Sequence, residues 1–549
     1  MKRYLLLTIA LFSTYAVMSQ GYATSGLLFD HDIISASSMA SLSQRNYMGT
    51  ARSMAMGGAF TSLGADMASL GINPAGFGMY QRNEVSITLG LGINKSKNYG
   101  ATPSTSGNSN VNCSVNNVGG SFQIYEGTGS LLALNFAFGY NKVADYNYEL
   151  SFMTPSSTTS VARTFADLAN SNSLGINADN KICDSNGYYD YDMDPYFWTT
   201  ALAYKGGLIN RGASGWITDE IAPGAKFDQR THLKSEGSAG EFSFALGGNI
   251  SNIVYFGVSL DVQSISRKQI LYYDEFVGYP EGAMPDATAY PYQLRDFELG
   301  QAMNINGTGI GAKFGVVVRP IKALRIGLAV HTPSYYSLSY RYNAALTSTA
   351  FSAGTNPDGY ELSKDGYLYS DFRTPKLEDI GSSRWAFATP TRVLVGLSYT
   401  IGKYAIISAD YEYDDFAGIR IKSAPIDYGF IDKALRNNFR GIHHIRAGIE
   451  AKPVSFLALR VGGGWTSRAI HTDYILPEPI MNSAWSVSAG LGFRISEITS
   501  IDIAYQYRNE RNSDYYTYFS ESNNGINASS LYGLDILRHN IAVTFAFRF

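Results

Sequence analysis

Hydrophobic and polar residues alternate with a period of two along most of the chain beyond residue 83. In the segment 84–94, side chains such as Val85 and Ile87 share one face, and Ser86 and Thr88 share the other. The same alternation recurs further along, at 132–141, 256–263 and 541–549. Alternation of this kind predicts β-strands with one face against an apolar phase and one face away from it.

The length of these segments and the composition of their polar face favour a membrane barrel over a soluble sandwich. The strands run to ten or more residues, and a tilted strand needs about 9–11 residues to cross a bilayer. The polar face holds Gly, Ala, Ser, Asn and paired charges, which suit a lumen. We therefore expect an all-β fold, a transmembrane antiparallel β-barrel.

The connections alternate between short turns and long polar loops, as in outer-membrane barrels. The short turns are Glu126–Ser130, Ser251-Asn252, Arg319–Lys322, Gly402-Lys403, Lys452–Val454 and Ser496–Thr499. The long loops lie near 95–112, 153–236, 274–296, 343–388, 416–437, 469–482 and 511–535. Together these connections join about fourteen strands.

Composition and the N-terminus place the chain outside the cytoplasm. Charged residues are 16% and aromatic residues 13% of the chain, and the net charge of -3 argues against a nucleic-acid partner. Residues 1–19 have the charged start and short apolar core of a signal peptide, with cleavage after Ser19 or after Ala23. In an exported chain Cys113 and Cys183 either form a disulfide or remain two separate thiols.

A small, Gly- and Ala-rich segment precedes the first strand: NYMGTARSMAMGGAFTSLGADMASLGINPAGFGMY, residues 46–80. It resembles the N-terminal hatch of the FadL/TodX family, which are outer-membrane channels for long-chain fatty acids and other hydrophobic compounds. The matching residues are Ala51, Arg52, Gly57, Gly58, Ala59, Asp66, Asn73, Pro74 and Ala75.

The resemblance implies three segments: the signal peptide, an N-terminal extension and hatch at 20–82, and a barrel at 83–549 around the hatch. It implies passive uptake of hydrophobic small molecules across the outer membrane of a Gram-negative bacterium, gated by Arg52, Gly57, Gly58, Asp66, Asn73, Pro74 and Ala75. It also implies a monomer without cofactors, surrounded by outer-membrane lipid. The terminal Phe549 is typical of chains that the barrel-assembly machinery inserts.

Charged residues on the polar face of several strands predict a network inside the lumen. Across paired strands we expect Asp410 and Glu412 near Arg446, Glu450 near Arg460, and Arg494 opposite Asp502, with Arg52 and Asp66 joining from the hatch. Such pairs contribute about 0.2–1 kcal/mol each. We favour a structural role for this network over a proton relay or an ion-selective filter.

The largest loop, 153–236, contains the aromatic segment 194–209. An apolar capture site for a hydrophobic ligand and simple packing of the loop are equally compatible with the residues Tyr196, Phe197, Trp198 and Leu202.

Other classes of protein are less compatible with the sequence. The chain has no GxSxG or HExxH motif, and its seven histidines are scattered, so we expect neither an enzyme nor a metal site. Fewer than about 60 mature residues precede the first strand, too few for the globular plug of a 22-stranded receptor barrel. A polar porin and a structural or adhesive surface barrel remain as alternatives.

Overall fold

A computed structural model of the chain describes residues 35–46, 48–100, 108–218, 224–279, 292–352, 361–362, 367–373, 384–424, 428–471, 481–522 and 525–549. The predicted signal peptide lies outside these residues. Among them, no helix is long and apolar enough to cross a bilayer. Cys113 and Cys183 are both free thiols.

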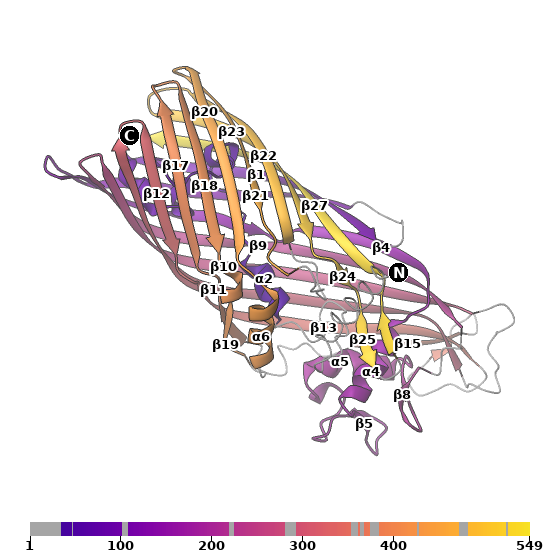
Figure 1. Ribbon diagram of the computed structural model, residues 1–549. Coiled ribbons are helices and arrows are strands. Elements are labelled where there is room, and N and C mark those ends of the chain that lie inside the picture. Colours follow the sequence, from indigo (N-terminus) through magenta and orange to yellow (C-terminus); the bar gives the residue numbers. More distant parts are fainter. Residues whose placement is uncertain are drawn as a thin grey trace, which may run out of the picture.

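The structure is a closed barrel of 14 antiparallel strands, which confirms the predicted fold (Figure 1). The last strand pairs with the first from Glu84↔Arg548 to Gly100↔Tyr532, so the wall has no open edge there. In order around the wall, the strands are β1 (Glu84–Gly100), β2 (Asn108–Glu126), β3 (Leu131–Asp145), β9 (Lys226–Ile250), β10 (Val254–Gly278), β11 (Tyr292–Ile321), β12 (Leu324–His331), β17 (Arg392–Ile401), β18 (Ala405–Asp414), β20 (Ile442–Val454), β21 (Leu457–Thr466), β22 (Met481–Arg494), β23 (Thr499–Asn512) and β27 (Leu531–Arg548).

Further elements extend or cover the barrel. Additional strands are β4 (Tyr148–Ser157), β5 (Gly175–Ile176), β6 (Ile182–Cys183), β7 (Asn210–Gly212), β8 (Gly215–Ile217), β13 (Tyr335–Ser352), β14 (Glu361–Leu362), β15 (Tyr367–Arg373), β16 (Arg384–Ala388), β19 (Arg420–Ser423), β24 (Tyr515–Tyr516), β25 (Phe519–Ser522) and β26 (Gly525–Ala528). The helices are α2 (Ala36–Ser43), α3 (Ala51–Ala55), α4 (Val161–Ser171), α5 (Trp198–Lys205) and α6 (Gly429–Asn438), with 3-10 turns η1 (Met67–Leu70), η2 (Pro74–Met79), η3 (Asp190–Asp192), η4 (Pro195–Phe197) and η6 (Phe416–Gly418).

The apolar side chains change face partway along the longest strands. On β10, Val258 and Leu260 point outward and are 44% and 51% exposed, whereas Ile265 and Leu271 point inward and are buried. On β11 the same change occurs, because Ile310 and Phe314 are exposed outside whereas Met303 and Ile305 are buried inside; Leu338 and Tyr340 on β13 are buried inside as well. Because an outward apolar face requires an apolar solvent, this inversion marks where the strands leave the bilayer.

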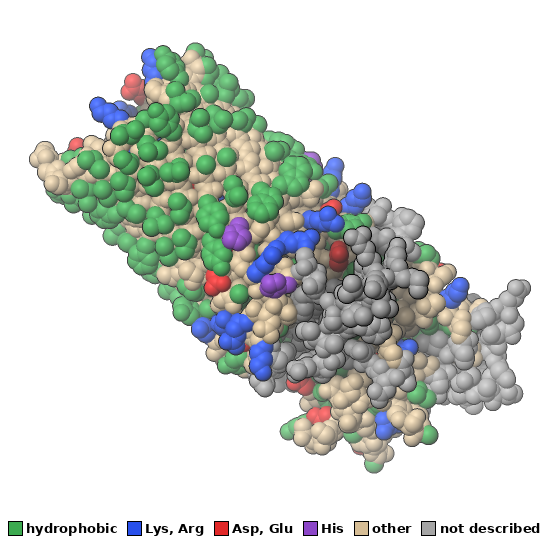
Figure 2. Space-filling model, in the orientation of Figure 1, with side chains coloured by type: hydrophobic (Ala, Val, Ile, Leu, Met, Phe, Trp, Pro, Cys, Tyr) green, Lys and Arg blue, Asp and Glu red, His purple; other side chains and the backbone are tan. Residues whose placement is uncertain are grey.

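Beyond the inversion, the long strands continue as a tower that stands outside the membrane region. Figure 2 shows the green apolar side chains gathered over one end of the wall, with Lys, Arg and His side chains at the boundary. On the same wall, Trp465 and Trp485 pair across β21 and β22 and are half exposed, as in the aromatic girdle of such barrels. The tower therefore begins at the level of these aromatic residues.

The strands are longer than the sequence predicted. The segments expected as loops near 95–112 and 274–296 are strand at both of their ends, since β1 runs to Gly100, β2 starts at Asn108, β10 runs to Gly278 and β11 starts at Tyr292. The difference arises because the tower strands have an apolar core of their own, outside the bilayer. The short turns lie where they were expected, at the end of the barrel that carries the C-terminus (Figure 1).

Candidate functional site

The hatch (residues 46–80) lies inside the barrel at the level of the outward apolar band and consists of one short helix and two 3-10 turns. Its polar motif residues are helix caps. The Asp66 carboxylate accepts from the Ala68 backbone amide (2.9 Å), and Asn73 Oδ1 accepts from the Ala75 amide (3.0 Å). Pro74 follows at the first position of η2, where a missing N–H costs nothing.

Asn73 also connects the two halves of the hatch. Its Nδ2 donates to the Thr61 carbonyl oxygen (2.7 Å), while the Thr61 amide donates to the Asp410 carboxylate on β18 (2.7 Å). Asn73 and Asp410 are both almost fully buried. The Asn73 side chain thus fixes the turn at 73–75 to the bend at Thr61, and the Thr61 amide fixes that bend to the wall.

Glycines allow the hatch backbone to lie directly against the wall. Gly57 has φ +67°, and a Cβ there would lie 2.6 Å from the Gly463 backbone nitrogen. On the wall, a Cβ at Gly257 would overlap the backbone of Pro74 and Ala75, and one at Gly327 would overlap Thr61. Several wall glycines are cross-strand neighbours, as in the pairs Gly247↔Gly257, Gly257↔Gly315, Gly327↔Gly396 and Gly448↔Gly462.

Side chains of the wall satisfy backbone carbonyls of the hatch. Lys313 Nζ donates to Leu70 O (2.9 Å), and Asn135 Nδ2 donates to Phe77 O (2.7 Å). His331 Nε2 lies 2.9 Å from Ile72 O, and Ser488 Oγ donates to Ala55 O (3.1 Å). The hatch therefore fills the lumen as a bonded plug whose release requires several hydrogen bonds to break together.

Arg52 joins the hatch to a charge network on the wall. Its Nε lies 2.9 Å from Glu450, and its Nη1 lies 3.8 Å from Asp66. Arg460 pairs with Glu450 (2.7 Å) and with Asp502 (2.5 Å). The structure thus brings these five predicted residues together where the hatch meets the wall.

The remaining predicted charges divide between two other arrangements. Arg446 pairs with Glu412, whereas Asp410 binds the hatch at Thr61. The expected Arg494–Asp502 pairing is wrong, because the turn between β22 and β23 sets the register so that Arg494 faces Ser500 and Asp502 faces Gly492.

Glu412, Asp414 and His444 lie close enough to hold a metal ion, each offering one ligand atom within 4.8 Å of the others. Arg392 approaches both carboxylates (3.9 and 3.6 Å), and Arg446 pairs with Glu412. The guanidinium groups already supply the compensating charge, so the arrangement is that of an ion-pair network.

A second network was not predicted. Lys313 pairs with Glu241 and with Asp261 (2.9 Å), and Arg45 reaches Glu241 (3.0 Å). All three wall residues are inward charges in strands with outward apolar residues. These inward charges could have predicted the network from the sequence, because a charge buried in the lumen requires an oppositely charged partner.

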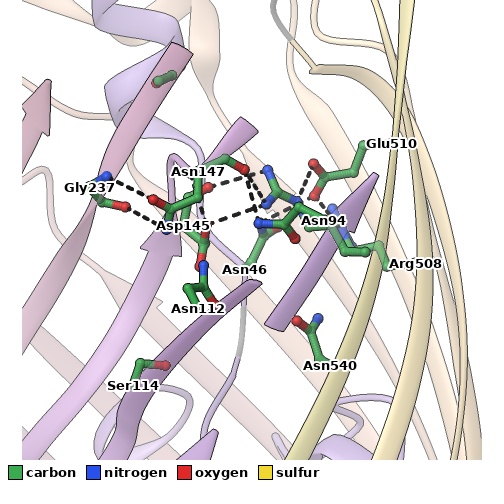
Figure 3. A network of polar contacts seen from close by, with 12 residues as sticks. Asn46, Asn94, Asn112, Ser114, Asp145, Asn147, Gly237, Arg508, Glu510 and Asn540 are labelled. Atoms are coloured by element: carbon green, nitrogen blue, oxygen red, sulfur yellow. Dashed lines mark hydrogen bonds and ion pairs between the residues drawn. The ribbon is translucent and has the colours of Figure 1, made fainter. Parts of the chain in front are cut away.

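The wall has a seam between β2 and β3. β2 pairs with β1 along nearly its whole length, but with β3 only from Asn117↔Asn141 to Glu126↔Ala133. Beyond Asn141 the β3–β4 junction passes along the inner side of the neighbouring strands. There Asp145 accepts from the Asn112 amide (3.2 Å), as Figure 3 shows.

Polar side chains hold this junction in place. Asn94 Nδ2 donates to Asn147 O (3.0 Å), and Arg538 on β27 reaches Asp145 (3.4 Å) and Glu510 (2.8 Å). The contacts of Asn94 with Asn147 and of Arg538 with Asp145 join the junction to β1 and β27, whereas Arg538 and Glu510 lie on the paired strands β27 and β23 (Figure 3 shows the region). The seam is therefore closed by side chains instead of a backbone ladder.

The predicted capture residues lie in a lid over the tower, formed by α4, α5 and the short strands between them (Figure 1). Trp198 and Leu202 are fully buried in the lid core, and Tyr196 and Phe197 are half-buried with ring centroids 4.4 Å apart. Only the second pair therefore presents part of its surface to solvent or ligand.

Glu275 connects the lid to the wall near the outer end of β10. Its carboxylate accepts from the Ser160 hydroxyl (2.6 Å) and from the Val161 amide (2.9 Å), at the start of α4. Burial raises the pKa of Glu275 to about 7, although these hydrogen bonds act in the opposite direction.

The barrel, its outward apolar band and its inner plug define an outer-membrane-type β-barrel closed by its own N-terminal segment. No family model and no curated protein matches the chain. Among solved structures, it is similar to the Pseudomonas putida toluene transporter TodX, with 13% identity, 92% of this chain and 99% of that chain covered, and a TM-score of 0.48.

It is also similar to a Pseudomonas aeruginosa FadL homologue, with 10% identity, 90% and 98% of the chains covered and a TM-score of 0.49. For the Ralstonia pickettii toluene transporter TbuX the values are 14%, 92%, 99% and 0.47. At these identities no residue role transfers from those proteins.

Substituting Gly257 by valine should displace the hatch from the wall, because its side chain would occupy the space of the Pro74–Ala75 backbone. Overpacking of this kind costs about 1–3 kcal/mol. In planar bilayers the folded variant should conduct more than the wild type. Gly129→Val, in a turn with open space around the glycine, is the matched control. Equal conductance of all three proteins would show that the hatch does not depend on this contact.

Raising the pH should loosen the lid. The pKa of Glu275 is about 7 when folded and near the ordinary 4.5 when unfolded. The folded state therefore binds the extra proton, and the stability of the lid falls as pH rises from about 5 to about 8. Hydrogen exchange of α4 amides, corrected for intrinsic pH dependence, should show this fall. It should vanish in Glu275→Gln and persist in Glu236→Gln, a half-exposed control on β9. A fall that survives in Glu275→Gln contradicts the assignment.

Proposed function

We propose that the protein is an outer-membrane channel for passive uptake of hydrophobic small molecules, with the hatch as its gate. The observation that carries the proposal is the polarity of the tower interior. Inward side chains such as Ile265, Met303 and Leu338 form a continuous apolar core with the lid residue Trp198. A polar porin requires a water-lined interior along its whole path, which such a core does not provide.

The arrangement along the barrel supports capture outside and gating within the membrane. A hydrophobic solute gains free energy on leaving water for the apolar tower, about 25 cal/mol for each Å² of buried apolar surface. The half-buried pair Tyr196 and Phe197 at the lid is a suitable first contact. The solute then meets the charged, hydrogen-bonded lumen around the hatch, which it cannot enter without the hatch moving.

The seam between β2 and β3 supports a lateral route from the tower towards the bilayer. Its closure relies on Asn112, Asp145 and Arg538 side chains, which can separate without unzipping a backbone ladder. Movement of the hatch would affect the same region, because Asn46 at the start of the hatch donates to Glu510, the partner of Arg538 (3.2 Å). A lateral route spares an apolar solute from entering water.

The resemblance of the hatch sequence to the FadL/TodX family supports the same substrate class. A structural or adhesive barrel would have no use for a lumen plug held by buried caps such as Asn73. We also propose that the protein has no catalytic role. It acts as a monomer whose partners are the hydrophobic solute, the membrane lipid and the barrel-assembly machinery.

The gate is tested by replacing Asn73 and Pro74 with alanine together. The double variant loses the cap of η2 and the bond to Thr61, so the hatch should open more readily while the barrel stays folded. Cells that lack other such channels and produce the double variant should take up a radiolabelled hydrophobic compound several-fold faster than cells that produce the wild type. Asn186→Ala, on an exposed lid loop, should leave uptake unchanged. Unchanged uptake in a correctly assembled double variant would remove the hatch from the mechanism.

A further inference from the structure

Three cationic side chains lie together on the outer wall, just beyond the apolar band, where β20 and β21 approach the tower. They are Arg440, His443 and Arg468, and all three are exposed. Figure 2 shows His, Lys and Arg side chains gathered at this boundary, next to the end of the green apolar surface. We call these three residues the collar cluster.

The collar cluster lies at the depth of the lipid head groups. Ile445 pairs with Trp465, which in turn pairs with Trp485, and the two tryptophans mark the aromatic girdle. Arg468 follows Trp465 by three residues, which corresponds to about 8 Å along the membrane normal at a tilt of about 40°. The head-group layer of one leaflet is about 5–8 Å thick. A long arginine side chain at this position therefore reaches the lipid phosphates.

Within the described part of the chain, neither arginine of the cluster has a carboxylate partner. Arg440 Nε donates to the Arg468 carbonyl oxygen (3.3 Å), and the Arg440 amide donates to Ala469 O (2.9 Å), so the two arginines are held side by side. The carboxylates of the neighbouring strand β18 are buried in the lumen, where they have partners of their own. On α6, the Asp432 carboxylate accepts from the Ile421 amide. Two adjacent cations without a counter-charge attract an anion.

His443 adds a hydrogen-bond donor next to the arginines. Its Nδ1 lies 2.8 Å from the Tyr411 hydroxyl, and its amide donates to Ser467 Oγ (2.9 Å), beside Arg468. The Tyr413 ring packs against the imidazole, with ring centroids 5.4 Å apart. When the Tyr411 hydroxyl donates to Nδ1, the proton of the neutral imidazole is on Nε2. That group is then available to donate to an oxygen of a bound anion.

The same contact between a tyrosine and a histidine recurs on the outer face between β23 and β27. There His539 Nδ1 lies 2.8 Å from the Tyr505 hydroxyl. The cations nearby, Lys97 and Arg511, both face Asp535 across paired strands, so a carboxylate of the wall compensates them. The collar cluster has the same tyrosine-supported histidine and lacks such a carboxylate.

We infer that the collar cluster binds the phosphate of a lipid head group in the surrounding leaflet. The phosphate lies between Arg440 and Arg468 and accepts from His443 Nε2, because guanidinium groups match the oxygens of a phosphate. The acyl chains lie against Ile445 and Trp465, which face outward directly below the cluster. This apolar surface favours a lipid over a free phosphate ion. The inference concerns the outer wall and goes beyond the proposed uptake.

The test is quenching of tryptophan fluorescence by brominated lipids. Of the five tryptophans, Trp198, Trp216 and Trp385 are buried, whereas Trp465 and Trp485 are half exposed on the outer wall. The full chain is reconstituted in phosphatidylcholine vesicles that contain a small fraction of phosphatidic acid or phosphatidylcholine with brominated acyl chains. In the wild type, brominated phosphatidic acid should quench with an apparent affinity about tenfold higher than brominated phosphatidylcholine, and added salt should reduce this preference.

Arg440→Gln combined with Arg468→Gln should abolish the preference, so that the two brominated lipids quench equally. The corresponding lysine double variant should retain most of it, because the charge remains. The control is Lys226→Gln combined with Arg230→Gln, which removes the same charge from exposed tower positions of β9. Arg230 is twelve residues from the outward Phe242, about 40 Å along the strand, so this variant should keep the tenfold preference.

The remaining outcomes overturn the inference. Equal quenching by the two lipids in the wild type shows that the wall has no phosphate site, and a preference that survives in the glutamine double variant places the site elsewhere. An equal loss in the control variant identifies an effect of net charge alone. Loss of the preference in millimolar inorganic phosphate assigns the cluster to a free anion. If the glutamine double variant fails to migrate as a folded barrel, Arg468→Gln alone should lower the preference about threefold.

Discussion

The close packing of the hatch backbone against the wall backbone is the contact on which the rest of the structure depends. Strands that face lipid outside must present small residues inside wherever another chain segment fills the lumen. Gly257, Gly327 and Gly448 meet that requirement, and the hatch contributes Gly57 at a left-handed φ. Backbone groups brought this close must be satisfied locally, and Asn73, Asp410 and Lys313 do so.

The barrel combines two environments along one set of strands. Near the hatch the outside is apolar and the inside carries compensated charge; in the tower the outside is polar and the inside apolar. β10 makes the change between Val262 and Ile265 without a break in its hydrogen-bond ladder. The same wall can therefore cross a bilayer, hold a polar plug and continue beyond the membrane around an apolar core.

Much of the fold followed from the sequence because alternation and turn spacing are local signals. The strand count, the short turns and the position of the hatch were all predictable. The tower was missed because the inversion on β10 keeps the period of two and changes only its phase. Predicting the ion pairs of the lumen required the register of each strand pair. The pair of Glu450 and Arg460, across the turn between β20 and β21, was predicted correctly. Across the turn between β22 and β23, Arg494 was assigned to Asp502, two residues beyond Ser500, which it faces. Long-range contacts such as Arg52 with Glu450 were accessible only through the family resemblance.

The most direct test of the central claim is to extract the purified protein with organic solvent and identify what co-purifies by mass spectrometry. The structure predicts a recurrent apolar molecule, because the apolar tower interior favours its retention. That molecule should be depleted when Asn73 and Pro74 are replaced. A clean extract from wild-type protein, together with a large and steady conductance that hydrophobic compounds do not change, would contradict the account and identify a polar pore instead.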